Sequence, residues 1–241
     1  MTSTNHTDFA ASNASYVSAQ SKMALLPNYY KWTYSALKPY LRGKVVELAA
    51  GAGYGIGTYI DQASKVIAVD HDPDLLRVLK SQYADVETLD VDLLGDWEGL
   101  DGGADAIVMM DVVEHFEDDL AFLRKVHSKL KPGGHALIKV PAQEALYSQI
   151  DVASGHYRRY EEKMLRELAA SSGFEVCLLR HINVVGSMVY KRKKHNKSNF
   201  SKTFKSGQLK LINLLIPVIA AIDSILPGPG LSLLAVLQRP E

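Results

Sequence analysis

VVELAAGAGYG, residues 45–55, runs from an apolar segment directly into a glycine-rich turn. Glycine permits positive φ and lets the backbone approach a ligand closely. A helix that begins near Tyr54 would present free N–H groups at the same place. In open α/β sheets, ligands bind beyond the carboxyl ends of the strands, next to such turns. The stretch therefore predicts a nucleotide-like ligand on a doubly wound α/β domain.

Apolar runs on both sides of this turn alternate with segments of helical length. Short runs rich in Val, Ile or Leu predict buried strands at residues 44–49, 65–70, 86–91, 104–110 and 135–140. Helices are expected at 73–83, with Asp72 as N-cap before Pro73, and at 118–130, which the breaker residues 131–134 end. Repeated β-α units of this kind predict a parallel sheet with right-handed crossovers.

The last third of the chain adds one helix and two strands, predicted at 161–172, 174–182 and 231–238. Cys177 is expected to pack in the core. An insertion at 183–230 separates the two strands. Its residues 191–210 carry eight Lys or Arg and no acid, and an apolar stretch follows at 211–226.

Composition limits the classes of protein to consider. The 241 residues suit one α/β domain with additions. A net charge of zero gives no support to nucleic-acid binding, and one cysteine excludes a disulfide framework or a cysteine zinc cluster. Residues 1–22 show no signal-peptide pattern and are expected to be mobile. Because 211–226 is short for a membrane span and contains Pro217 and Asp223, a cytoplasmic protein is expected.

The glycine spacing and its flanking acid separate two kinds of ligand. A dinucleotide fingerprint starting at Gly51 would need glycine at position 56, where the chain has Ile56. Glu47 would repel a pyrophosphate but would attract an ammonium group. S-adenosylmethionine (SAM) has an amino-acid end and no phosphate. The turn therefore favours SAM over a nicotinamide dinucleotide.

Acids at the ends of the next strands extend the predicted cofactor site. Asp70 ends the second strand, where a carboxylate can bind both ribose hydroxyls. Asp90 is expected to accept from the adenine amino group while the Val91 N–H reaches a ring nitrogen, with Asp92 as the alternative to Asp90. The full set of expected cofactor contacts is Glu47, Gly51, Gly53, Asp70, His71, Asp90, Val91 and Asp111.

Several motifs, in this order, resemble class I SAM-dependent methyltransferases. They are VVELAAGAGYG (45–55), VIAVDHDP (66–73), DAIVMMDVVEHFEDD (105–119), LKPGGHALIKVPA (130–142), LYSQIDVASGHYRRY (146–160), SSGFEV (171–176) and GLSLLAVLQRP (230–240). The chain looks most like the bacterial type 11/12 branch, in the subgroup associated with glycosyltransferases. The resemblance implies a Rossmann-like seven-stranded sheet of order 3-2-1-4-5-7-6, with strand seven antiparallel.

This resemblance also divides the chain and marks two departures. Residues 1–40 are expected to form an N-terminal extension or lid, and 41–241 the methyltransferase domain. Ala49 replaces the first glycine of the family's E-x-G-x-G-x-G pattern. The chain also lacks the N/D-P-P-Y pattern after strand four, at Asp111, which argues against a nucleic-acid base or a glutamine as substrate.

Methyl transfer needs alignment of a nucleophile, and a base if that nucleophile carries a proton. His115 and His156 are the candidate bases. Residues expected to bind the acceptor are Tyr29, Asp151, Tyr157, Arg159 and Tyr160. A purely structural, interlocked loop at 151–160 is the competing interpretation. No required metal is predicted, because no tight ligand spacing is apparent.

Three functions fit these residues. The first is methylation of an O or N atom of a small molecule, in natural-product or sugar metabolism, with S-adenosyl-L-homocysteine as by-product. The second is methylation of a lipid-linked or glycan substrate at a membrane. The third is non-catalytic SAM binding. Residues 191–226 are candidates for peripheral membrane contact, a lid or a dimer surface, and the chain is expected to be a monomer or homodimer.

Overall fold

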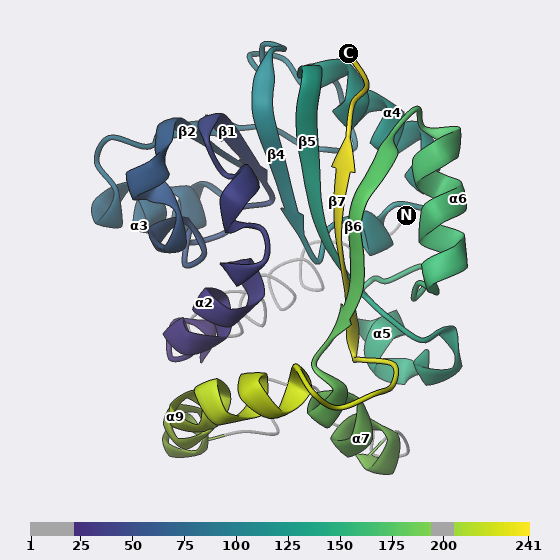
Figure 1. The fold of residues 1–241 in the computed structure, drawn as a ribbon. Coiled ribbons are helices and arrows are strands. Elements are labelled where there is room, and N and C mark those ends of the chain that lie inside the picture. Colours follow the sequence, from purple (N-terminus) through teal and green to yellow (C-terminus); the bar gives the residue numbers. More distant parts are fainter. Residues whose placement is uncertain (1–21, 194–204) are drawn as a thin grey trace, which may run out of the picture.

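A computed structural model describes residues 22–193 and 205–241 (Figure 1). Seven strands form one sheet in the order β3-β2-β1-β4-β5-β7-β6. Their bounds are β1 Gly43–Leu48, β2 Ala63–Asp70, β3 Glu87–Asp90, β4 Ala104–Met110, β5 Leu130–Pro141, β6 Glu175–Ile182 and β7 Ser232–Gln238. The first five strands pair in parallel, whereas β7 runs antiparallel between β5 and β6. The predicted fold class, strand order and antiparallel strand are confirmed.

Helices cover both faces of the sheet. On one face lie α4 (Asp119–Lys129) and α6 (Glu162–Ser171), which bury Leu123 and Leu165 against the central strands. On the other face lies α3 (Pro73–Gln82), which buries Leu79. Because both faces are buried, the central strands are almost continuously apolar, which is why short apolar runs located them.

Two predicted helix starts are confirmed in detail. The Asp72 carboxylate accepts from the backbone N–H groups of Asp74 and Leu75, and Pro73 occupies the first helical turn of α3. Asp118 caps α4 by accepting from Ala121 N–H at 2.8 Å. These caps satisfy donors that a helix start leaves free.

A group of helices lies beyond the carboxyl ends of the parallel strands (Figure 1). Its members are α2 (Pro27–Ser35), α5 (Gln149–Ala153), α7 (Val184–Lys193) and α9 (Ser206–Asp223). Short 3-10 turns complete the architecture at Lys38–Tyr40, Ile56–Thr58, Ile60–Gln62, Val113–His115 and Glu144–Leu146. Helix α2 belongs to the predicted N-terminal extension, and α7 and α9 belong to the predicted insertion.

Three local predictions are wrong. No α-helix begins near Tyr54, because the chain there forms two 3-10 turns whose hydrogen bonds span three residues. The strand predicted at 135–140 begins earlier, at Leu130, directly after α4 ends at Lys129, so residues 131–134 belong to β5. Cys177 is exposed, because β6 is the edge strand and has few buried residues. Residues 1–21 of the stretch 1–22 that was expected to be mobile, and residues 194–204 of the basic segment 191–210, lie outside the described residues.

Candidate functional site

The glycine turn bends tightly after β1. Ala49, Gly51 and Gly53 all have positive φ, at 52°, 55° and 75°. A Cβ atom on Gly53 would lie 2.7 Å from the Leu79 side chain, so only glycine fits there without a shift. The backbone N–H of Gly51 donates to the Asp70 carboxylate at 2.7 Å. The turn is therefore attached to the end of β2 by the acid that was predicted to bind ribose.

Asp70 is almost completely buried, with an exposed fraction of 2%. Its second oxygen accepts from Asp72 N–H at 3.0 Å, so each oxygen has one backbone donor and one further lone pair. His71 is exposed, with its Nδ1 3.8 Å from Asp70. Asp70 is therefore held in one orientation at the end of β2, and each of its carboxylate oxygens can accept one more hydrogen bond.

Glu47 is buried between two tyrosine hydroxyls. Tyr34 donates to one carboxylate oxygen at 2.8 Å, and Tyr59 donates to the other at 2.5 Å. Burial raises the pKa of Glu47, while these two hydrogen bonds oppose the rise. Tyr34 comes from α2, so the N-terminal extension closes over this acid.

The loop after β3 has a different arrangement from the predicted one. Val91 N–H donates to the Asp70 carbonyl at 3.2 Å, so its predicted hydrogen bond to an adenine nitrogen is wrong. Asp92 accepts from Leu94 N–H at 2.9 Å within its own loop. Asp90 is exposed at the strand end. Of the two acids, Asp90 is therefore the one left facing solvent without a backbone partner among the described residues.

Lys139 is a site residue that the sequence reasoning missed. It lies on β5 with 4% exposed surface and forms a close ion pair with Asp111, which follows β4. Although burial alone lowers the pKa of Lys139, the Asp111 carboxylate outweighs this effect and raises it. A lysine inside the apolar run ALIKVP was the available signal.

Tyrosines of α2 border this ion pair. The Lys139 ammonium lies 5.9 Å from the Tyr29 ring centre. Burial, reinforced by Tyr29, raises the pKa of Tyr30, which therefore keeps its proton at neutral pH. Tyr29, predicted to bind the acceptor, is thus beside Asp111 and Lys139 at the carboxyl ends of β4 and β5.

Asp151 organises the loop between β5 and α6. It is 1% exposed, and one carboxylate oxygen accepts from Arg159 Nε at 2.8 Å and lies 3.2 Å from His156 Nδ1. Burial raises its pKa, but the contacts with His156 and Arg159 outweigh burial and lower it. Asp151 is therefore ionised at neutral pH, and both it and Arg159 lie behind His156.

The two candidate bases are neighbours. The His115 and His156 rings lie 4.8 Å apart, edge to face. Burial, with a contribution from His156, lowers the pKa of His115, which is therefore neutral at pH 7. The loops after β4 and β5 are joined here by a 2.8 Å hydrogen bond from Tyr157 N–H to the Glu114 carbonyl.

Glu114 completes a group of possible metal ligands. Its carboxyl is fully buried, and neither oxygen has a hydrogen-bond partner within the described part of the chain. Donor atoms of Glu114, His115 and His156 lie within 4.8 Å of one another. No tight ligand spacing is apparent in the sequence, but the fold brings these three side chains together. The arrangement suits proton transfer as well as a metal, and the absence of a required metal stays a prediction. Burial, followed by repulsion from Asp111, raises the pKa of Glu114 well above its ordinary value.

The last two predicted acceptor ligands have opposite environments. Tyr157 is 52% exposed and free to contact an acceptor. Tyr160 is fully buried in the core, and its hydroxyl donates to Asp119 at 2.9 Å. The prediction that Tyr160 binds the acceptor is wrong, because its polar atom already has a structural partner.

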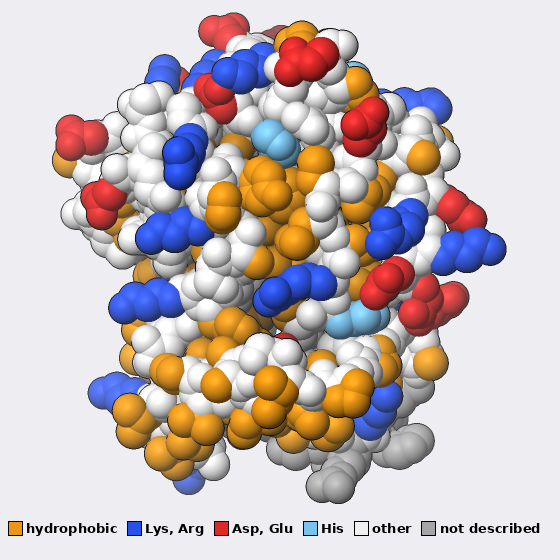
Figure 2. Space-filling model, viewed as in Figure 1, with side chains coloured by type: hydrophobic (Ala, Val, Ile, Leu, Met, Phe, Trp, Pro, Cys, Tyr) orange, Lys and Arg blue, Asp and Glu red, His pale blue; other side chains and the backbone are white. Residues whose placement is uncertain are grey.

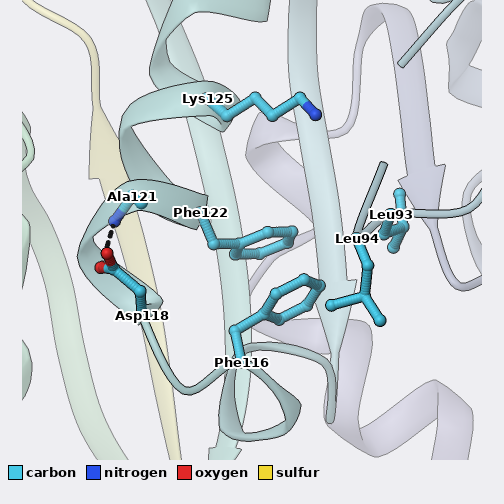
Figure 3. A pocket seen from close by; sticks show the side chains of 7 residues that line it. All are labelled: Leu93, Leu94, Phe116, Asp118, Ala121, Phe122 and Lys125. Carbon is cyan, nitrogen blue, oxygen red and sulfur yellow. Dashed lines mark hydrogen bonds between the residues drawn. The ribbon is translucent and has the colours of Figure 1, made fainter. Parts of the chain in front are cut away.

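A small pocket lies between the loop after β3 and the start of α4 (Figure 3). It has a volume of about 180 Å³, and its lining residues are Leu93, Leu94, Phe116, Asp118, Ala121, Phe122 and Lys125. Cavities that hold drug-sized ligands usually have about 300–1,000 Å³. Because it contains none of the predicted site residues, this pocket is not part of the candidate site.

Comparisons with known proteins agree with the fold and the turn. Residues 31–179 match the family described as methyltransferase domain. A probable SAM-dependent methyltransferase of Mycolicibacterium smegmatis is 29% identical over 134 residues, which are 55% of this chain and 52% of the relative. A Mycobacterium tuberculosis protein of the same description is 28% identical over 132 residues, 54% of this chain and 48% of the relative. The chain thus matches about half the length of these curated relatives.

Solved structures show the same fold. The Burkholderia thailandensis 1,6-didemethyltoxoflavin-N1-methyltransferase, with bound 1,6-didemethyltoxoflavin and S-adenosylhomocysteine, superposes with a TM-score of 0.59 at 16% identity. The match covers 98% of this chain and 87% of that one. A SAM-dependent methyltransferase of Archaeoglobus fulgidus gives 0.59 at 19% identity and covers 88% and 94%.

Proposed function

Because the chain belongs to the methyltransferase domain family, we propose that it transfers a methyl group from SAM to an O or N atom of a small molecule. The observation that carries the proposal is the contact of His156 with the buried Asp151, 3.2 Å apart, beside a neutral His115. Bound SAM supplies an electrophilic methyl group. What remains for the protein is to hold the cofactor, orient the acceptor and take its proton.

The residues at the glycine turn fit the cofactor. Glu47 offers a buried carboxylate for an ammonium group, next to positive-φ glycines that allow close approach. Asp70 keeps an unused lone pair on each oxygen, as a ribose diol requires. Asp90 is left free to contact the adenine. A phosphate-bearing dinucleotide would meet the carboxylate of Glu47 instead of an anion-binding group.

His156 is the proposed base. An ionised carboxylate only accepts hydrogen bonds, so Asp151 places the proton of His156 on Nδ1 and leaves a lone pair on Nε2. This arrangement orients the ring for proton abstraction, as in other His–Asp pairs. Arg159 keeps Asp151 ionised and fixed by its 2.8 Å contact. His115, which is neutral, lies beside His156 and is the second candidate.

Two tyrosines are available to contact a small acceptor. Tyr29, half-buried beside Lys139, and the exposed Tyr157, which follows His156, each offer a ring face and a hydroxyl group. Lys139 and Asp111 are paired with each other, so their charges are largely balanced. These surroundings favour a neutral or weakly anionic oxygen- or nitrogen-bearing acceptor.

A labelled-methyl assay with SAM and fractionated metabolites and lipids tests the proposal. Transfer to at least one fraction is expected. His156→Ala and Asp151→Asn should then lower kcat by about 10²-fold or more while SAM affinity stays unchanged, as loss of general base catalysis predicts. Tight SAM binding with no transfer to any fraction would favour the non-catalytic alternative.

The methyl-transfer rate in the presence of a chelator shows whether His115 and His156 act as bases or, with Glu114, bind a metal. If His156 acts as the base, then EDTA leaves the rate unchanged. A rate that EDTA abolishes and a divalent metal restores would instead assign Glu114, His115 and His156 to a metal site.

A further inference from the structure

Helix α9 exposes a continuous apolar face. Leu211, Leu214, Leu215, Val218 and Ile222 are between 41% and 70% exposed, and Ile225 just beyond the helix is 80% exposed. Their spacing places all of them on one side of the helix. Figure 2 shows this apolar face as a band of hydrophobic side chains along the lower edge of the molecule. Exposure of this many large aliphatic side chains in one patch marks an interaction surface.

The opposite side of α9 attaches it to the domain. Leu209 and Ile216 are buried there. Asn213 accepts from Asn28 N–H at 2.8 Å, and its carbonyl accepts from the Asn28 side chain at 2.9 Å. Asp223 accepts from Asn183 N–H at 2.9 Å at the start of α7. These contacts fix the helix in place, so the apolar face is presented outward.

This attachment argues against a membrane-spanning role. Among the described residues, α9 is the one helix that is long and apolar enough to cross a membrane, by length and composition alone. Its 18 residues correspond to about 27 Å of helix, slightly less than the roughly 30 Å hydrocarbon core. Spanning would also bury the polar contacts of Asn213 and Asp223 in lipid. A helix that lies flat in the membrane–water interface avoids both the length mismatch and the burial of these polar contacts.

The charge around the apolar face is positive. Lys205 and Lys210 are exposed at the start of α9, and Lys191 is exposed at the end of α7. Residues 191–210 contain eight Lys or Arg and no acid. The single acid of α9, Asp223, accepts two backbone hydrogen bonds from the start of α7. The surface therefore combines an apolar centre with basic flanks.

We propose that α9 binds the surface of an anionic lipid bilayer, with its apolar face in the headgroup and acyl boundary. The basic residues are attracted to the negative surface of such a membrane, and burial of the apolar side chains adds to binding. A second copy of the chain would bring another basic segment toward the first, which repels it. The apolar face and its basic flanks together therefore favour an anionic lipid surface over a second copy of the chain as the partner of α9. The inference does not depend on methyl transfer.

Vesicle sedimentation of the full chain tests this proposal. With vesicles of phosphatidylcholine and phosphatidylglycerol in equal amounts, the protein should sediment, and high salt or pure phosphatidylcholine should weaken binding at least about tenfold. The double variant Leu214→Ser, Val218→Ser and the double variant Lys205→Glu, Lys210→Glu should each lose about tenfold or more. Leu94→Ser is the matched control, since Leu94 is 78% exposed outside α9.

All four substituted positions of the two test variants are exposed, so each variant should keep the wild-type unfolding temperature. No binding of the wild-type chain to anionic vesicles, or equal binding by the variants, would overturn the proposal. Concentration-dependent dimerisation that Leu214→Ser, Val218→Ser abolishes, without vesicle binding, would assign the face to a second copy.

Discussion

Ala49 holds a left-handed backbone conformation at the position where its family has glycine. Its φ is 52°, and a left-handed conformation costs a non-glycine residue roughly 1–2 kcal/mol. The turn keeps its shape because Gly51 is bonded to Asp70 and because β1 and β2 are paired on either side. Alanine at position 49 therefore strains the backbone locally, while the rest of the turn keeps its shape.

Replacing Ala49 with Gly should raise the free energy of unfolding by about 1 kcal/mol, because glycine adopts this conformation without strain. Urea unfolding of the ligand-free protein measures the change. Ala50→Gly is the matched control, since Ala50 has no positive φ and should lose stability. A destabilised Ala49→Gly variant would show that the turn is not strained at this residue.

Glu114 is the second residue in conflict with its surroundings, because its buried carboxyl has no hydrogen-bond partner in the described part of the chain. Burial raises its pKa, so the folded protein binds more protons than the unfolded chain above the ordinary pKa of 4.5. Within that window its contribution to stability falls as pH rises, by about 1.4 kcal/mol per pH unit.

Glu114→Gln should remove this pH dependence. The variant should be more stable than wild type at pH 7 to 8, with a difference that shrinks as pH falls toward about 4.5 and stays constant below it, where the glutamate is protonated in both states. Unfolding in urea at several pH values provides the comparison. A stability difference that does not change with pH would mean that Glu114 is ionised in the folded protein.

At the scale of elements, α2 is joined to β1 through the buried side chain of Tyr34. Tyr34 packs on Tyr59 with ring centres 5.8 Å apart and donates its hydroxyl proton to Glu47. A Cβ on Gly55 would overlap the Tyr34 ring, so the glycine turn is shaped to receive α2. Helix α2 therefore contributes to the proposed cofactor site.

Tyr34→Phe should cost about 1.5–3 kcal/mol, because a hydrogen bond to a buried charged group is lost. Thermal or urea unfolding measures this loss. Tyr30→Phe is the comparison variant, since Tyr30 lies on the same helix and the structure shows no hydrogen bond from its hydroxyl to Glu47. Equal effects of the two substitutions would show that the hydroxyl of Tyr34 contributes nothing specific.

The strands buried on both faces could be predicted from sequence, because each is a short apolar run. The start of α3 could be predicted too, because Asp72 is a typical N-cap residue. Cys177 was misplaced because the same apolar pattern occurs on an edge strand, where the neighbouring strand and not the sequence decides burial. Lys139 was missed because its partner Asp111 is 28 residues away and the pairing depends on the register of β4 and β5. The proximity of His115 to His156 likewise arises from two separate loops.

At the scale of the whole molecule, the predicted site residues gather at one edge of the sheet. The acids predicted to bind the cofactor and the pair His115 and His156 all lie at or just after the carboxyl ends of β1, β2, β4 and β5. Helices α2 and α9, far apart in sequence, lie together over this edge and are joined by the Asn28–Asn213 hydrogen bonds (Figure 1). The proposed lipid surface on α9 therefore faces away from the sheet, while its other side packs against α2 and the start of α7.

Calorimetric titration with S-adenosylhomocysteine and with NADH tests most directly whether the glycine turn binds SAM. We expect S-adenosylhomocysteine to bind and NADH not to bind. Asp90→Ala should weaken binding of S-adenosylhomocysteine by about tenfold without changing the unfolding temperature, since Asp90 is exposed. Binding of NADH with no response to S-adenosylhomocysteine would contradict SAM binding at the turn.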